Sequence, residues 1–191
     1  MNMFNRLPNF VEIKNIKYKI NVDFRYMLQF EKILKDNSIS DEQKVLKALQ
    51  CFYPYFYTRP EELLKDASLY KEACEKLIWF YRCGREETKS NKKSGATHKQ
   101  NKIYDFELDD EYIWEAFYRH YKIDLTKDFV HWWKFRAILK SLPEDTQFSK
   151  IQGYRSYKGD DKNLLELKNI YKLPLEKEEQ ERLDKLYDML K

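Results

Sequence analysis

The scarcity of glycine and proline is the feature that most restricts what this chain can fold into. Of its 191 residues, four are Gly and five are Pro. Tight turns and β-corners depend on these two residue types, so a β-sandwich or barrel is disfavoured. Aromatic residues make up 16% of the chain and charged residues 36%. This combination favours a mainly α protein, a multi-helix, bundle-like fold in which amphipathic helices bury large rings and expose charges.

One short segment near the N-terminus departs from helical spacing. Apolar and polar residues alternate from residue 10 to 22, and the phase of the alternation shifts at Lys14 and Asn15. A two-residue turn fits at that shift, so the pattern predicts a small N-terminal β-hairpin.

From Asp23 onward the apolar residues recur at helical spacing, and capping signals divide them into separate helices. Ser40 with Gln43 three residues later predicts a capping box, and Thr58 with Glu61 repeats the pattern. Ser68 is expected to open a helix that ends at Gly84. Further helices are expected from about 23 to 35, 110 to 121, 129 to 142, 146 to 157, 160 to 171 and 176 to 191.

The basic charge of the chain is concentrated in one polar segment. Residues 84–102 hold six Lys or Arg and two Glu, which accounts for the whole net charge of +4. We interpret 85–102 as a flexible Lys-rich linker between an N-terminal part, 1–84, and a C-terminal helical part, 103–191, which can also pack together as one domain. Because the excess lies in a linker and not on a folded face, nucleic acid is disfavoured as the partner, with weak contact through this segment as the alternative.

Several kinds of chemistry are not indicated. The four glycines form no phosphate-binding pattern, and the three histidines lack metal-ligand spacing, so we expect no cofactor, no metal and no enzyme activity. The pairs Asp109–Asp110 and Asp160–Asp161 are interpreted as helix caps. Three cysteines without CxxC spacing read as reduced thiols, and no signal peptide or membrane span is apparent, so a cytoplasmic protein is expected.

Two aromatic segments are candidates for contact with a protein partner. Tyr53, Tyr55, Phe56 and Tyr57 lie so close together that some of them must be exposed. The segment from Phe129 to Leu142 is interpreted either as the core of the C-terminal half or as a contact surface made of Trp132, Trp133 and Arg136. Arg136 is expected to stack on an indole, with Asp110 or Asp124 as its anionic partner.

Three segments carry a resemblance to a known family. They are IKYKINVDFRYMLQFEKIL, FELDDEYIWEAFYRHYKIDL and HWWKFRAILKSLPEDTQFSKIQGYR, the last of which ends in Tyr154 and Arg155. Together they resemble the phage gene-product-fifteen family, encoded in tail modules of phages and prophages of Gram-positive bacteria.

The resemblance implies a place in phage tails and no catalytic residues. It suggests a tail-assembly chaperone in the bacterial host cytoplasm, with the tape-measure protein or another tail protein as partner. A structural minor tail or connector protein and a nucleic-acid-binding regulator are the alternatives. On this basis Tyr154 and Arg155 join Trp132, Trp133 and Arg136 as candidate partner-binding residues.

Overall fold

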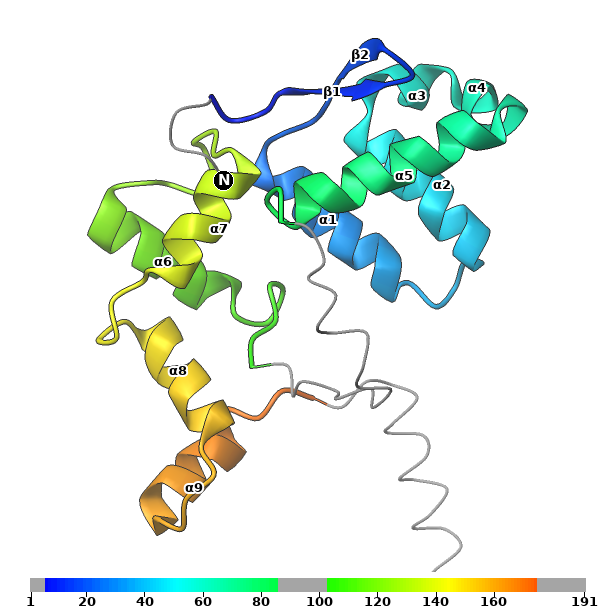
Figure 1. Ribbon diagram of the computed structural model, residues 1–191. Coiled ribbons are helices and arrows are strands. Elements are labelled where there is room, and N and C mark those ends of the chain that lie inside the picture. Colours follow the sequence, from blue (N-terminus) through cyan, green and yellow to red (C-terminus); the bar gives the residue numbers. More distant parts are fainter. Residues whose placement is uncertain (1–5, 86–102, 175–191) are drawn as a thin grey trace, which may run out of the picture. The chain divides into compact units, whose positions relative to one another are not determined.

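A computed structural model describes residues 6–85 and 103–174 of the chain. Helices dominate these residues, with one two-stranded sheet at the N-terminal end (Figure 1), so the expected mainly α fold with a small hairpin is confirmed. The predicted Lys-rich linker and the last predicted helix lie outside the described residues. The elements are β1 (Phe10–Ile13), β2 (Ile16–Lys19), α1 (Phe24–Lys35), α2 (Asp41–Phe52), α3 (Pro54–Thr58), α4 (Pro60–Lys65), α5 (Ala67–Tyr81), α6 (Asp110–Tyr121), α7 (Trp132–Lys140), α8 (Gln147–Ser156) and α9 (Lys162–Ile170).

The chain divides into two compact units. Unit 1 comprises residues 1–96 and 121–141, and unit 2 comprises residues 97–120 and 142–191. The segment that contains α7 therefore belongs with the N-terminal elements, although the sequence-based division places it in the C-terminal part. Unit 2 contains α8, α9 and all of α6 except its last residue.

The hairpin of unit 1 turns at the two residues indicated by the sequence. β1 and β2 pair antiparallel, with Ile13 opposite Ile16 and Val11 opposite Tyr18. Lys14 and Asn15 have φ angles of 49° and 62°, the left-handed conformation that a two-residue type I′ turn requires. The side chains of Val11 and Ile13, on one face of β1, are buried. The hairpin thus covers part of the unit 1 core.

Side-chain caps explain where most helices of unit 1 begin. Asp23 caps α1, and Ser40 and Gln43 form the predicted capping box at the start of α2. The predicted cap at Thr58 is wrong, because Thr58 ends α3 and its hydroxyl donates to the carbonyl of Tyr55. Arg59 precedes α4 without a side-chain cap, and Pro60 supplies the fixed φ of a first helical residue.

The ends of α5 differ slightly from the prediction. The helix begins at Ala67, one residue before Ser68, and the carboxylate of Asp66 accepts the N–H groups of Ser68 and Leu69. At the other end the N–H of Gly84 donates to the carbonyl of Trp79 and that of Cys83 to Phe80. These two bonds form a Schellman cap, in which Cys83 has a φ of 58° and Gly84 of 72°. Gly84 is thus part of the predicted helix stop.

Aromatic rings fill much of the core of unit 1. Phe24 stacks on Phe135, and Phe52 contacts Phe80 with ring centroids 5.2 Å apart. The fully buried large side chains of this unit include Phe52, Tyr53, Phe56, Phe80, Trp132 and Phe135. This packing joins α1, α2, α3, α5 and α7.

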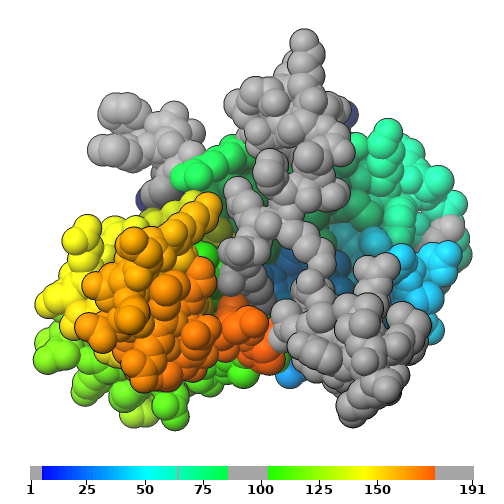
Figure 2. All heavy atoms as spheres, turned by 90° about the horizontal axis from the view of Figure 1, so that it is seen from below, coloured from blue at the N-terminus to red at the C-terminus, as the bar shows by residue number. Residues whose placement is uncertain are grey.

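The described part of unit 2 has a smaller core than unit 1. Phe106, Ile113, Phe117, Phe148 and Ile151 are its large buried apolar side chains among the described residues. Thr146 caps α8 and Asp161 caps α9. α9 contains no buried residue, and its side chains lie at the surface in Figure 2, where they are orange. In neither unit is any described helix long and apolar enough to cross a membrane.

Candidate interaction surfaces

The aromatic segment 53–57 separates into buried and exposed rings. Tyr53 and Phe56 are completely buried, whereas Tyr55 is 37% and Tyr57 is 74% exposed. The short helix α3 produces this division, since residues three apart face the core together. The expected exposed aromatic surface is therefore present, and its outward members are Tyr55 and Tyr57.

Neighbouring side chains hold Tyr55 in place. Its ring and that of Tyr18 of β2 form a T-shaped pair with centroids 5.5 Å apart, and the guanidinium of Arg59 lies 5.0 Å from the ring centre. Its hydroxyl donates to a carboxylate oxygen of Glu62 at 2.8 Å, and this bond raises the pKa of Tyr55. We call Tyr18, Tyr55 and Tyr57 the tyrosine surface. Its orientation is partly fixed before any partner arrives, which lowers the entropic cost of binding.

The paired tryptophans of α7 lie in the core of unit 1. Trp132 is completely buried and Trp133 is 6% exposed. Their indole N–H groups donate to the carbonyls of Tyr81 and Phe80, at 2.9 and 2.8 Å. The two rings are therefore core residues, as one of the two interpretations of this segment expects. The core is that of unit 1, which contains the N-terminal helices, and not that of the C-terminal half. The cost of burying two indole N–H groups is offset by these bonds.

Arg136 lies against Trp132, as the spacing predicts. Its guanidinium carbon is 5.3 Å from the centre of the Trp132 ring, and the side chain is half-buried. Asp124, one of the two carboxylates expected beside it, accepts the N–H and hydroxyl of Thr126. The stack on indole covers one face of the guanidinium and leaves Arg136 within reach of solvent.

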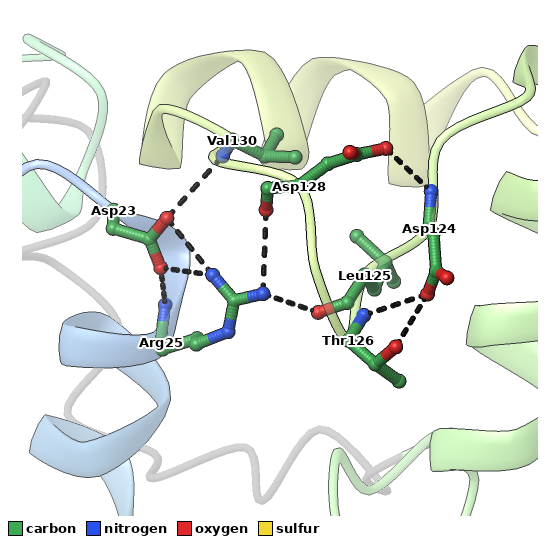
Figure 3. Close-up of polar contacts among 7 residues, drawn as sticks. All are labelled: Asp23, Arg25, Asp124, Leu125, Thr126, Asp128 and Val130. Carbon is green, nitrogen blue, oxygen red and sulfur yellow. Dashed lines mark hydrogen bonds and ion pairs between the residues drawn. The ribbon is translucent and has the colours of Figure 1, made fainter.

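A network around Arg25 fixes the loop that leads into α7 (Figure 3). One guanidinium nitrogen of Arg25 donates to both carboxylate oxygens of Asp23, each at 3.0 Å. The other donates to the carbonyls of Leu125 and Asp128, at 2.6 and 3.3 Å. Asp23 also accepts the N–H of Val130. Arg25 therefore joins the start of α1 to residues a hundred positions later.

A backbone bridge and a histidine complete this junction within unit 1. The backbone N–H of Phe24 donates to the carbonyl of Val130, and the backbone N–H of Trp132 donates to the carbonyl of Val22. Nδ1 of His131 accepts the N–H of Trp133, so Nε2 carries the proton and donates to the carbonyl of Pro8. Burial lowers the pKa of His131, while the bond to Pro8 opposes the shift. The neutral imidazole thus caps α7.

Arg155 is the centre of a comparable network in unit 2. Its two terminal nitrogens donate to the two carboxylate oxygens of Asp109, at 2.6 and 2.9 Å. It also donates to the carbonyls of Ile103 and Tyr171, while Tyr154 stacks on the Tyr171 ring. The side chains of Arg155 and Asp109 are only 9% and 1% exposed. These bonds join three separate segments of unit 2.

This network corrects the interpretation of Asp109 as a capping side chain. The backbone carbonyl of Asp109 does accept the first intrahelical hydrogen bond of α6, from the N–H of Ile113. Its carboxylate, however, accepts hydrogen bonds from the N–H of Asp105 and from the guanidinium of Arg155. The partner-binding roles predicted for the nine residues remain predictions. Among them, Tyr55 and Tyr57 are the side chains most exposed to a partner.

A second exposed aromatic pair, on α6, was not singled out from the sequence. Trp114 and Tyr118 stack with ring centroids 5.3 Å apart and planes 8° apart, and they are 38% and 49% exposed. Ile113 and Phe117, their neighbours in sequence, face the core. The signal was available, because α6 carries more large apolar residues than one buried face can hold.

The comparisons with known proteins give one match. The family model described as bacteriophage Gp15 protein matches residues 3–187, nearly the whole chain. Neither the curated proteins nor the solved structures contain a match. Among the described residues, no group of three or more His, Cys, Asp or Glu side chains is placed to hold a metal ion. The chain belongs to the bacteriophage Gp15 protein family, which indicates a phage structural or assembly protein.

Proposed function

We propose that this protein is a phage or prophage tail-assembly factor that acts in the host cytoplasm. Its partner is the tape-measure protein, which it binds before the tail tube forms, and it works by binding, without catalysis or a cofactor. The observation that carries the proposal is the family match over residues 3–187. The exposed aromatic rings of the two units are the physical features that support a binding role.

The tyrosine surface suits reversible contact with an amphipathic helix. A tape-measure protein exposes apolar stripes until the tube surrounds it, and aromatic rings cover such stripes at low entropic cost. Tyr55 is held by Arg59 and Glu62, and Tyr57 presents most of its ring to solvent. Phenol hydroxyls keep this surface compatible with water when no partner is bound.

Co-purification tests the proposal directly. The full chain, tagged and expressed in cells in which the prophage is induced, is expected to bring down the tape-measure protein. Tyr57→Ala removes the most exposed ring and is expected to reduce recovery about tenfold. Tyr26→Ala, which removes another exposed tyrosine of unit 1, is the matched control and should not reduce it. If the tape-measure protein never co-purifies, the proposal is wrong.

Two further measurements separate the alternatives. Mass spectrometry of purified particles should lack an assembly factor, whereas a minor tail or connector protein would be present. Retention on DNA at low salt, lost when residues 85–102 are deleted, would instead support a nucleic-acid-binding regulator.

A further inference from the structure

The outward face of α6 carries a stripe of acidic and aromatic side chains. Asp110 and Glu111 are exposed in the first turn, and Trp114 and Tyr118 follow at spacings of three and four residues. Side chains at these spacings lie on one side of a helix. We call these four residues the α6 stripe. It is a surface on which two carboxylates lie beside two stacked rings.

The opposite face of α6 anchors the stripe to unit 2. Ile113, Ala116 and Phe117 are buried, and the residue before the helix, Asp109, forms the buried pair with Arg155. The stacking of Trp114 on Tyr118 further limits the motion of both rings. A partner would therefore meet a surface whose shape is already set, which favours binding.

The charges on the helix define what the stripe would bind. Glu115 pairs with Arg119 at 3.2 Å, so these two neighbouring charges compensate each other. Asp110 and Glu111 then give the first turn a negative charge, with the ring faces of Trp114 and Tyr118 one turn away. Ring faces attract Lys and Arg cations, and carboxylates add to that attraction while repelling acidic partners.

We propose that the α6 stripe binds a cationic amphipathic helix of a partner protein. Basic side chains of that helix pair with Asp110 and Glu111, and its apolar or guanidinium groups cover the rings of Trp114 and Tyr118. The inference rests on the proposed function in taking the partner to be a protein. It adds the chemistry of the partner and a second contact surface, located on unit 2 and not on unit 1.

Defined peptides test this inference with the full chain. The probes are a helical Leu/Lys peptide and a Leu/Glu peptide of the same pattern, each titrated by isothermal calorimetry. The Leu/Lys peptide is expected to bind and the Leu/Glu peptide to bind at least about tenfold more weakly. Binding should weaken as salt is added, because exposed charges are screened.

Variants then locate the binding surface. The double substitution Asp110→Asn and Glu111→Gln keeps side-chain shape at two exposed positions, and it should weaken binding of the Leu/Lys peptide about tenfold. Tyr118→Ala should weaken it to a similar degree, while Tyr26→Ala, which removes an exposed tyrosine outside both surfaces, should leave it unchanged. Circular dichroism of each variant checks that helix content is retained.

Two outcomes would overturn the inference. One is equal binding of the Leu/Lys and Leu/Glu peptides. The other is a double Asn/Gln variant that binds the Leu/Lys peptide within about twofold of the original protein, because such a small change is below what loss of two charges should produce. Neither outcome bears on whether the tape-measure protein co-purifies, so the proposed function is judged separately.

Discussion

Two arginines, Arg25 in unit 1 and Arg155 in unit 2, perform similar tasks in different surroundings. Each pairs with an aspartate and donates to two backbone carbonyls from other segments. The Arg25 side chain is 42% exposed and that of its partner, Asp23, is 12% exposed. The corresponding values for Arg155 and Asp109 are 9% and 1%. Water can therefore replace much of what Arg25 provides, but little of what Arg155 provides.

The surrounding packing increases this contrast. Unit 1 has a broad aromatic core and a backbone bridge between the segments that Arg25 joins. Unit 2 has fewer large buried side chains among its described residues, and α9 buries none. We infer that the described part of unit 2 depends strongly on the buried pair of Arg155 and Asp109, whereas unit 1 distributes its stability over many contacts.

The largest expected effect is that of Arg155→Ala. Removing the guanidinium leaves the Asp109 carboxylate buried without its cation, which should lower the free energy of unfolding by about 3–5 kcal/mol. Urea denaturation measures the total loss, and hydrogen exchange should rise in the α8 and α9 segments. Arg155→Lys keeps the charge without the forked geometry, so its free energy of unfolding should lie between those of the original protein and Arg155→Ala. For Arg155→Ala, a loss in unfolding free energy below about 1 kcal/mol would contradict the difference between the two units.

Arg25→Ala should have a smaller effect, about 1–2 kcal/mol, because water can reach the site left by the partly exposed guanidinium. Hydrogen exchange should increase in residues 124–130 and little elsewhere. If Arg25→Ala proved as damaging as Arg155→Ala in the same urea titration, burial would not be what distinguishes the two arginines.

Acid should weaken unit 1 through His131. Its pKa is lowered in the folded protein, so the unfolded chain binds the proton more readily. Stability is therefore fully retained above about pH 6.5, the ordinary pKa of histidine, and declines as the pH falls towards the lower folded value. Hydrogen exchange between pH 7 and 5, corrected for its intrinsic pH dependence, should show opening at the start of α7. His131→Gln should remove this part of the pH dependence; an unchanged profile would argue against His131 as its source.

The smallest expected effect is that of Arg119→Ala. Its ion pair with Glu115 is exposed on both sides, so the loss in unfolding free energy should not exceed about 0.5 kcal/mol. Thermal denaturation of Arg119→Ala and Arg155→Ala under the same conditions compares the two losses directly. A loss comparable to that of Arg155→Ala would show that charge alone, and not burial, determines these effects.

Local patterns predicted the local structure well. The turn at Lys14 and Asn15 and the box at Ser40 and Gln43 each depend on residues within three positions of one another, so the sequence displays them directly. The error at Thr58 has the same origin, because a correct capping pattern can be overridden when the preceding helix extends over the cap residue.

Contacts between residues far apart in the sequence were much harder to predict. Asp109 and Arg155 are 46 positions apart, and no periodicity connects them. The assignment of α7 to unit 1 likewise depends on bonds across more than fifty residues, from Trp132 and Trp133 to the end of α5. For the candidate surfaces, composition indicated that some rings must be exposed, but the choice of Tyr57 over Phe56 needed the helix orientation.

Gly84 gives the end of α5 a further consequence. A Cβ atom added there would lie 2.9 Å from Cη2 of the Trp133 ring, in a backbone conformation that other residues rarely adopt. The chain therefore leaves α5 at a point dictated by a core tryptophan. A larger side chain at this position would force the end of α5 or the Trp133 ring to move, so the way the chain leaves the helix is coupled to the core of unit 1.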